Sequence, residues 1–306
     1  MNTRLIGLDW GTSSLRAYLM SDAGQILDRR EVPAGILTVE NQAFEPVFLA
    51  QVQDWRGGQA NCAIVASGMI TSRQGWIETP YQPCPAGREE LAAATHEHQL
   101  DDGTSIHFIT GVAVNHDAAG IPDVMRGEET QIVGAFDADQ TAVAVMPGSH
   151  SKWVQITQGK VANFTTFMTG EVYAALIRQT ILGRVVTKER DDPDAFRQGL
   201  SLGLDEGAAR GGILGRLFSA RTLVLFDRLD GDAVPSYVSG LVLGTEIREA
   251  QRAFDWGREP VHVIGGDALA RRYQEALGKA GIAIVRTEPD RAAFGHFAIA
   301  RAKGLI

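Results

Sequence analysis

The chain has 306 residues, of which 44% are hydrophobic and 22% are charged, and its formal net charge is -8. This composition is typical of a soluble enzyme with about two domains, and the acidic balance without a Lys/Arg-rich block argues against a nucleic-acid partner. Because no apolar run approaches the roughly 18 residues of a membrane span, and the start of the chain has no signal-peptide pattern, we expect a cytoplasmic protein with no membrane partner. The two cysteines, Cys62 and Cys84, suggest no disulfide framework.

The first half of the chain is predicted to contain mostly strands, with one helix between them. Its elements are three strands within residues 4–33 with turns at Gly11 and at residues 21–24, a helix over 44–56 ended by Gly57 and Gly58, and strands over 61–66 and 106–110. Three strands followed by strand–helix alternation favour an α/β layer structure.

The first predicted turn has the composition of a phosphate-binding hairpin tip. An apolar run ends in Asp9, and Gly11 is followed by three hydroxyl residues, Thr12, Ser13 and Ser14. The glycine lets backbone N–H groups point at an anion, and the hydroxyls add donors. The carboxylate of Asp9, at the end of the strand, can hold Mg²⁺ or its water shell beside phosphates. We therefore predict that the tip binds phosphate and that Asp9 binds the metal. The alternative is an ordinary hairpin with a polar turn.

Residues 128–136 predict a short helix between the halves, and we place the domain boundary between residues 136 and 137. The second half again begins with three strands. Its predicted elements are strands over 141–146, 152–157 and 160–165, a helical region over about 171–220 with breaks at Gly203, Gly207, Gly211 and Gly212, a helix over 237–252, a strand over 260–264, a helix reaching Lys279, a strand over 282–285 and a final helix over 292–303.

The second half contains a second hairpin tip and a glycine pair after a strand. The string Gly148-Ser149-His150-Ser151 aligns with the first tip, and two such hairpins suggest two related domains that face one nucleotide. Gly265-Gly266-Asp267 precedes a predicted helix and can form a backbone ledge under an adenine or ribose, although many α/β turns use glycine. The predicted nucleotide contacts in this half are Gly148, Ser149, His150, Gly265, Gly266 and Asp267. In the alternative, His150 faces solvent.

Taken in this order, the two hairpins and the strand–glycine–helix segment resemble the superfamily of sugar kinases, heat-shock chaperone ATPases and actin over nearly the whole chain. Within it, several strings resemble the 2-dehydro-3-deoxygalactonokinase family, and the most specific is Met125-Arg-Gly-Glu-Glu-Thr-Gln131. The strings lie at residues 9–17, 67–73, 122–131 and 148–153. One departure is Ser149, where the family usually has threonine, and the hydroxyl is kept.

This resemblance implies an α/β fold of two ribonuclease H-like (actin-like ATPase) domains that flank an interdomain nucleotide cleft. Residues 1–136 would form the N-terminal domain, which binds the sugar acid, and residues 137–306 the C-terminal domain, which binds the nucleotide. The implied reaction uses ATP and Mg²⁺ to phosphorylate the hydroxyl of the sugar acid that lies farthest from its carboxylate.

The catalytic base is expected at the start of the predicted helix between the halves. Phosphoryl transfer needs a carboxylate beside the attacking hydroxyl, and related carbohydrate kinases place an aspartate at this position. This chain has Glu128 and Glu129 there, so Glu128 is our first candidate and Glu129 our second. Asp123 is a third candidate, although a turn residue is the simpler interpretation. In the alternative, both glutamates only favour the helix dipole.

Four residues in or directly after the family-like strings are candidates for contacts with a sugar acid. A guanidinium fork holds a carboxylate best, which points to Arg73 and Arg126. Met69 and Trp76 can pack on the carbon face of the sugar. In the alternative, both arginines make structural or solvated salt bridges, and the aromatic residue belongs to the core.

Two other functions remain open at this point. One is a kinase for another sugar acid, such as 2-dehydro-3-deoxygluconate, because the two epimers differ by a single hydroxyl configuration. The other is a non-catalytic nucleotide-dependent switch, which the lack of a peptide-binding extension and the arginine-bearing loops disfavour. The partners expected are ATP and a small sugar acid, and the sequence does not indicate an oligomeric state.

Overall fold

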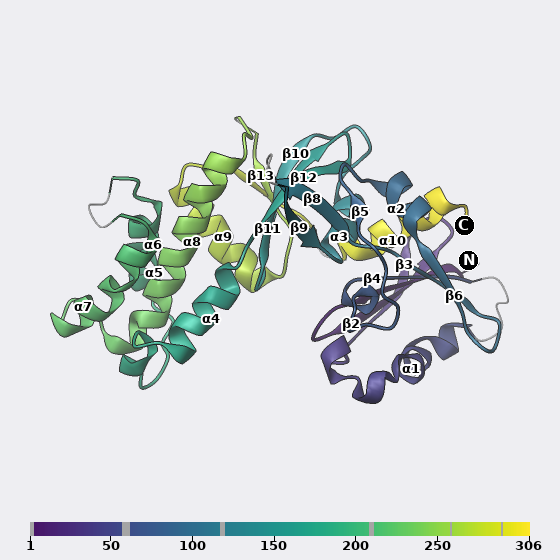
Figure 1. Cartoon of the computed structure of the whole chain (residues 1–306), viewed down its shortest axis with the longest axis horizontal. Coiled ribbons are helices and arrows are strands. Elements are labelled where there is room, and N and C mark those ends of the chain that lie inside the picture. The colour runs from purple at the N-terminus through teal and green to yellow at the C-terminus, as the bar shows by residue number, and fades with distance from the viewer. Residues whose placement is uncertain (1–2, 57–61, 117–119, 208–210, 258, 289) are drawn as a thin grey trace. The chain divides into compact units, whose positions relative to one another are not determined.

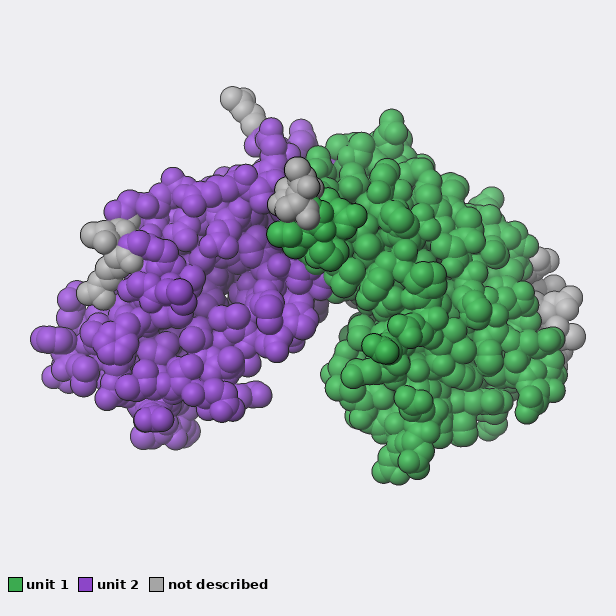
Figure 2. Space-filling model, viewed as in Figure 1, with its two compact units in different colours: residues 1–141, 155–164, 288–306 green, residues 142–154, 165–287 purple. Residues whose placement is uncertain are grey.

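The computed structural model describes residues 3–56, 62–116, 120–207, 211–257, 259–288 and 290–306. The chain forms two compact units, shown in green and purple in Figure 2. Unit 1 comprises residues 1–141, 155–164 and 288–306, and unit 2 comprises residues 142–154 and 165–287. In the described part of the chain, no helix has the length and apolar character that crossing a membrane requires.

Unit 1 contains a six-stranded sheet with the order β3-β2-β1-β4-β7-β6 (Figure 1). Its strands are β1 (Thr3–Trp10), β2 (Leu15–Ser21), β3 (Ile26–Val32), β4 (Ala63–Ser67), β6 (His96–Gln99) and β7 (Ser105–Phe108). The three opening strands, the buried strand after them and the strand near residue 106 are confirmed. β1 pairs antiparallel with β2 and parallel with β4, so the carboxyl ends of β1 and β4 meet at one edge of the sheet.

One face of the six-stranded sheet is covered by helix α1 (Phe44–Arg56). Its buried residues Phe44, Phe48, Val52 and Trp55 recur at helical spacing and join the core cluster of β1, β2 and β4. The predicted helix over 44–56 is confirmed, whereas the stop expected at Gly57 and Gly58 lies outside the described residues.

A smaller sheet of unit 1 leads directly to the predicted site. It has the order β5-β8-β9, formed by β5 (Gln82–Pro83), β8 (Val112–His116) and β9 (Ile121–Met125). β9 is followed by Arg126, Gly127 and helix α3 (Glu128–Ala135), which confirms the predicted short helix. Helix α2 (Arg88–Ala94) and the 3-10 turns η1 (Ile36–Thr38), η2 (Glu40–Gln42) and η3 (Met69–Thr71) complete the elements before α3.

The C-terminal helix α10 (Arg291–Lys303) belongs to unit 1 and packs against α3. The approach is so close that a Cβ at Gly134 would lie 1.9 Å from the Arg291 carbonyl oxygen, and one at Gly295 would lie 1.9 Å from that of Thr130. His296 of α10 bonds through Nε2 to Ser67 Oγ at 2.8 Å. Burial lowers the pKa of His296 to about 3, so the imidazole is neutral at physiological pH.

We expect Gly295→Ala to lower the free energy of unfolding by about 1–3 kcal/mol, because the added methyl group overlaps a backbone oxygen. The matched control is Gly278→Ala in α9 (Asp267–Lys279), where a Cβ meets nothing within 4 Å. There the free energy of unfolding should stay the same or rise by up to about 1 kcal/mol. Calorimetric melting of both variants checks this, and equal destabilisation would contradict the close helix contact.

Unit 2 contains most of a five-stranded sheet with the order β12-β11-β10-β13-β14. The strands of this sheet are β10 (Ala142–Met146), β11 (Ser151–Thr157), β12 (Lys160–Phe167), β13 (Val261–Val263) and β14 (Ile284–Arg286). The helical elements are α4 (Thr169–Gln179), η4 (Gly183–Val185), α5 (Pro193–Leu204), α6 (Ile213–Leu217), α7 (Ser219–Leu225), η5 (Gly231–Ala233), α8 (Val234–Ala253) and α9. All the predicted strands and the helices near 237–252 and 279 are confirmed.

The break predicted at Gly203 is wrong, because this glycine lies inside α5. A Cβ at Gly203 would lie 2.5 Å from the Leu241 carbonyl oxygen and 2.9 Å from Gly244 Cα. The glycine therefore serves the close packing of α5 against α8 rather than a turn. Of the other predicted breaks, Gly207 follows α5, and Gly211 and Gly212 precede α6.

Candidate active site

The predicted phosphate tip of unit 1 is a tight turn between β1 and β2. The Gly11 N–H donates to the Ser14 carbonyl oxygen at 2.9 Å, and Thr12 and Ser13 are exposed at the tip. The tip contacts residues 35 and 36, which the sequence analysis did not identify. The Ile36 N–H donates to the Gly11 carbonyl oxygen at 3.0 Å. A Cβ at Gly35 would lie 2.2 Å from the carbonyl oxygen of Thr12. Glycine is therefore required at position 35.

Three of the family-like strings meet beside Asp9. Asp9 and Ser67 are paired in the parallel β1–β4 ladder, so the loops after these strands emerge together. Gly68 has φ +93°, and its Cβ would lie 2.8 Å from the Trp10 carbonyl oxygen and 3.4 Å from Asp9 Oδ1. Gly127, with φ +110°, would place a Cβ 3.1 Å from Gly68 Cα. Two glycines in the left-handed region thus bring the start of α3 against the end of β1.

The carboxyl group of Asp9 is largely buried, with 13% of its side chain exposed. Arg16 Nη1 lies 3.6 Å from Asp9 Oδ2. Burial raises the pKa of Asp9 to about 6, the Arg16 charge opposes this, and the charges of Glu128 and Glu31 add to it. Burial disfavours the negative charge of Asp9 more than Arg16 stabilises it, and an acid in such surroundings is a candidate for a functional role. A bound cation would stabilise the charge.

The two glutamates at the start of α3 have different surroundings. Glu128 is half-buried, and its Oε2 accepts the Arg126 N–H at 3.0 Å. Glu129 is fully buried, and its carboxyl oxygens accept the Gly127 N–H at 2.7 Å and the Thr130 hydroxyl at 3.1 Å. Burial, followed by the charge of Glu128, raises the pKa of Glu129 to about 8. Glu128 is therefore the accessible carboxylate of the pair, and Glu129 is enclosed.

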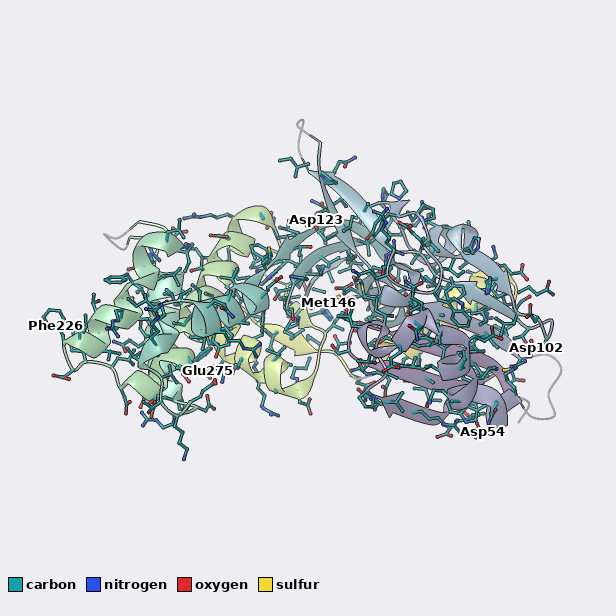
Figure 3. The ribbon with its side chains drawn as sticks, turned by 60° about the horizontal axis from the view of Figure 1, so that its bottom comes forward. Asp54, Asp102, Asp123, Met146, Phe226 and Glu275 are labelled. Carbon is teal, nitrogen blue, oxygen red and sulfur yellow. The ribbon has the colours of Figure 1, made fainter. Side chains whose placement is uncertain are left out.

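The third candidate base, Asp123, lies within β9 (Figure 3) rather than in a turn. It is paired with Val114 of β8, and its Oδ1 accepts the Val124 N–H at 2.8 Å. Asp123 is five residues away from Glu128 along the chain.

The two predicted carboxylate-binding arginines are placed differently. The guanidinium of Arg126 is buried and donates to the carbonyl and hydroxyl oxygens of Thr71 and Thr79 at 2.6–3.0 Å. It also lies over the ring of Tyr81, 4.2 Å from the centroid. Arg73 is exposed and makes no hydrogen bond or ion pair within the described residues. Arg126 therefore organises the 71–79 loop, whereas the Arg73 side chain is available to an anion.

Met69 and Trp76 both pack against the core of unit 1. The Trp76 ring lies 5.7 Å from that of Phe108 and 6.4 Å from that of Trp10, between centroids. Both side chains remain partly exposed. Their contacts favour the core interpretation, and a contact of either with a sugar stays a prediction.

In unit 2, the second hairpin tip lies against the N-terminus of α4. The turn follows Met146, the last residue of β10 (Figure 3). A Cβ at Gly170 would lie 2.6 Å from the Gly148 carbonyl oxygen and 2.7 Å from Ser149 Cα. The Glu171 N–H donates to the Ser149 carbonyl oxygen at 3.0 Å. Helix N-termini favour anions, so this arrangement suits the predicted phosphate contact, which stays a prediction. The role of Gly170 was not expected from the sequence.

His150 of the tip is exposed, and its Nε2 lies 2.5 Å from Glu171 Oε2. Neither earlier interpretation, phosphate contact or free exposure, included this pairing.

A buried acid is connected by hydrogen bonds to the strand that follows the second hairpin tip. Glu246 of α8 is 1% exposed and accepts hydrogen bonds from Trp153 Nε1 at 2.8 Å and from the Tyr273 hydroxyl at 2.9 Å. The Tyr273 hydroxyl also lies 2.7 Å from Ser151 Oγ, at the start of β11. Burial raises the pKa of Glu246, and these donors oppose the rise. No local sequence pattern marks Glu246, because its partners are distant along the chain.

The predicted ledge of Gly265, Gly266 and Asp267 is exposed between β13 and α9. A Cβ at Gly265 would lie 3.4 Å from Pro147 Cδ, so the ledge and the second hairpin are neighbours. Asp267 Oδ1 accepts a hydrogen bond from Arg286 Nη2 at 2.5 Å.

Comparison with known proteins gives matches over nearly the whole chain. A family model described as 2-keto-3-deoxy-galactonokinase matches residues 9–299. The 2-dehydro-3-deoxygalactonokinase of Escherichia coli (strain K12) is 32% identical over 292 residues, 95% of either chain. The crystal structure of a proposed 2-dehydro-3-deoxygalactonokinase from Sinorhizobium meliloti has a TM-score of 0.86 at 31% identity, over 97% of this chain and 98% of that one.

A more distant structure shares the fold alone. The activator of 2-hydroxyisocaproyl-CoA dehydratase from Clostridium difficile has a TM-score of 0.51 at 13% identity, over 98% of this chain and 96% of its own. The α/β fold of the actin-like ATPase and sugar kinase class, expected from the resemblance, is confirmed.

Proposed function

The chain belongs to the 2-keto-3-deoxy-galactonokinase family, and on this premise we propose that it transfers the γ-phosphoryl group of ATP to 2-dehydro-3-deoxygalactonate. The acceptor is the hydroxyl farthest from the carboxylate, and the product is the 6-phosphate of galactonate catabolism. The observation that carries the proposal is the match of the family model over residues 9–299. We place the reaction in the cytoplasm.

In unit 1, Glu128 is proposed as the base that accepts the proton of the attacking hydroxyl. Its partial exposure at the start of α3 leaves it accessible to a substrate. Enclosed Glu129 holds the Gly127 backbone N–H and so positions the turn that carries Glu128. The charge of Glu128 raises the pKa of Asp9, so the proposed base and the proposed metal ligand lie near each other.

Mg²⁺ is proposed to bind at Asp9. The described residues contain no group of three or more His, Cys, Asp or Glu side chains arranged for a metal. Mg²⁺ in phosphoryl-transfer sites takes one or two carboxylates together with phosphate oxygens and water, and the buried carboxyl group of Asp9 fits that pattern. Bound there, the ion would neutralise charge on the phosphates.

The two units are proposed to hold different parts of the substrates. In unit 1, Arg73 binds the carboxylate of the sugar acid while Arg126 keeps its loop in shape, and Gly11, Thr12 and Ser13 contact phosphate. In unit 2, Gly148, Ser149 and His150 contact phosphate beside the N-terminus of α4. The ledge of residues 265–267 lies under the adenosine.

We expect Arg73→Ala to raise the KM for the sugar acid by at least about tenfold, because a hydrogen bond to a charged group contributes about 1.5–3 kcal/mol. The KM for ATP should change little. Steady-state kinetics with each substrate varied measures both, and Arg301→Ala, an exposed arginine of α10, is the control. A rise in the KM for ATP alone would show that Arg73 does not hold the carboxylate.

The proposed function is tested by following ATP consumption with and without the sugar acid and identifying the product by phosphorus NMR. We expect turnover that depends on 2-dehydro-3-deoxygalactonate and gives a terminal phosphate ester. Turnover only with another sugar acid would reassign the substrate. Nucleotide binding without turnover of any sugar acid would mean that the protein is not a kinase.

A further inference from the structure

Three segments of unit 2 that the proposed function places against the nucleotide are far apart along the chain. They are the second hairpin tip at residues 148–150, the N-terminus of α4, and the ledge at residues 265–267, where α9 begins. Helix α8 packs against both α4 and α9 (Figure 1). It is therefore the element that can connect the three segments.

One carboxyl group of α8 makes these connections. Glu246 accepts hydrogen bonds from Trp153 Nε1 at 2.8 Å and from the Tyr273 hydroxyl at 2.9 Å. Its carboxyl group also forms hydrogen bonds with the hydroxyl groups of Ser151 and Thr169. Ser151 directly follows the hairpin tip, and Thr169 is the first residue of α4. Tyr273 belongs to the first two turns of α9, the helix that the ledge begins. Glu246 thus contacts a residue beside each of the three segments.

The surroundings of Glu246 are suited to holding these elements in one arrangement. The groups that lower its pKa are neutral hydrogen-bond donors, and they oppose the rise that burial causes. Because an ionised carboxylate only accepts hydrogen bonds, donors from β11, α4 and α9 converge on its two oxygen atoms. A buried polar network whose members are all satisfied fixes a unique packing of the elements that it joins. An apolar side chain of similar size would fill the same space without orienting the hydroxyl groups around it.

The Tyr273 hydroxyl connects α9 directly to the residue that follows the tip. It lies 2.7 Å from Ser151 Oγ and 2.9 Å from each carboxyl oxygen of Glu246. The ring of Tyr273 is buried in the same core cluster as Trp153. A buried hydroxyl with partners on two other elements sets the distance between α9 and the start of β11.

We propose that Glu246 is a positioning residue of the nucleotide site: through hydrogen bonds to the residues beside them, it holds the phosphate tip, the start of α4 and the ledge at the spacing that a nucleoside diphosphate spans. This inference rests on the proposed function and adds to it a group that touches no substrate. Segments that are already held in place lose less conformational freedom when a ligand binds, so the whole nucleotide binds more tightly. The benefit applies to a ligand that contacts the tip and the ledge together.

The test removes one hydroxyl group at a time from this network. Tyr273→Phe keeps the ring and deletes the hydroxyl that lies beside both Glu246 and Ser151, and Ser151→Ala deletes the other hydroxyl of that pair. Calorimetry measures the Kd for ADP and for adenosine, and steady-state kinetics gives the KM for ATP and for the sugar acid. We expect each variant to bind ADP about threefold to tenfold more weakly, as for one lost hydrogen bond. The affinity for adenosine, which reaches only the ledge, should not change, and neither should the KM for the sugar acid.

Tyr237→Phe is the matched control, because it deletes the same kind of hydroxyl in another part of unit 2. Tyr237 is a buried residue of α8, its hydroxyl lies 2.7 Å from Ser219 Oγ, and it belongs to a different core cluster. This variant should melt at a lower temperature, as Tyr273→Phe does, but keep the wild-type affinity for ADP. The double variant of Tyr273→Phe with Ser151→Ala should lose less affinity than the product of the two single losses, because the two hydroxyl groups act together.

The outcomes separate the inference from the proposed function. If the wild type binds ADP and the folded Tyr273→Phe and Ser151→Ala variants bind it equally well, the inference is overturned and the proposed function stands. An equal loss of ADP affinity in Tyr237→Phe would also overturn it, since the cause would then be general destabilisation. If the wild type binds neither ADP nor ATP, the proposed function fails, and the inference fails with it. Melting temperatures identify any variant that does not fold, and the other variant then decides the question.

Discussion

Glu128→Gln is expected to lower kcat by about 10²–10⁴-fold, the usual range for loss of a general base. Glutamine keeps the size of the side chain and can still accept the Arg126 N–H, which Glu128 Oε2 accepts at 3.0 Å. The start of α3 should therefore keep its shape, and calorimetric binding of the sugar acid should persist. Single-turnover kinetics at saturating substrates measures the loss in the chemical step.

Glu129→Gln is the matched control, because it makes the same chemical change at the neighbouring position. Burial raises the pKa of Glu129 to about 8, so this group is largely protonated at neutral pH and glutamine resembles its neutral form. The loss in kcat should be smaller than at Glu128. If Glu129→Gln has the larger effect, the base is Glu129 and our assignment is displaced by one residue.

Asp9→Asn is expected to lower kcat by more than about 100-fold, because the change removes a charge that faces the proposed phosphate and Mg²⁺ site. The concentration of Mg²⁺ needed for half-maximal activity should rise as well. Glu31→Gln is the control: Glu31 is the other carboxylate on Arg16, at 3.0 Å, and its loss should leave kcat nearly unchanged. Turnover near the wild-type value in Asp9→Asn would remove Asp9 from the mechanism.

The stability of Asp9→Asn distinguishes this role from a structural one. The pKa of Asp9 is raised to about 6 from 3.8, so the folded state holds this proton more tightly than the unfolded state. The contribution of Asp9 to stability therefore falls as pH rises through the interval from 3.8 to 6, and above it the buried charge is a cost. At pH 8 the variant should melt no lower than the wild type, although it has lost activity.

The local patterns in the sequence were sufficient to predict the strands on either side of the two hairpin tips. Each tip is a contiguous string in which an apolar strand ends in a glycine and hydroxyl turn, so hairpin geometry follows from the residues themselves. The small sheet could not be predicted in this way. Its β5 has only two residues and includes Pro83, and β9 contains Pro122, so neither shows the alternation on which a strand prediction depends.

The residues that hold the two hairpin tips in place could not be predicted from the sequence either. Gly35 and Gly170 are required by close approaches to the two hairpin tips, and such approaches leave no periodic signal. Glu246 acts through Trp153 and Tyr273, which are distant from it along the chain. The opposite error occurred at Gly203, where a glycine that permits helix packing was interpreted as a break.

The return of residues 288–306 to unit 1 has a consequence for synthesis of the protein. Helix α3 begins with both candidate bases. It packs against α10, and Gly134 of α3 lies in close contact with Gly295 of α10. Unit 2 lies earlier in the chain than α10, so it can complete its core while α10 is still inside the ribosome. The half that holds Asp9 and Glu128 is therefore begun first and completed after unit 2, because α3 gains its contact with α10 only once residues 165–287 have been made.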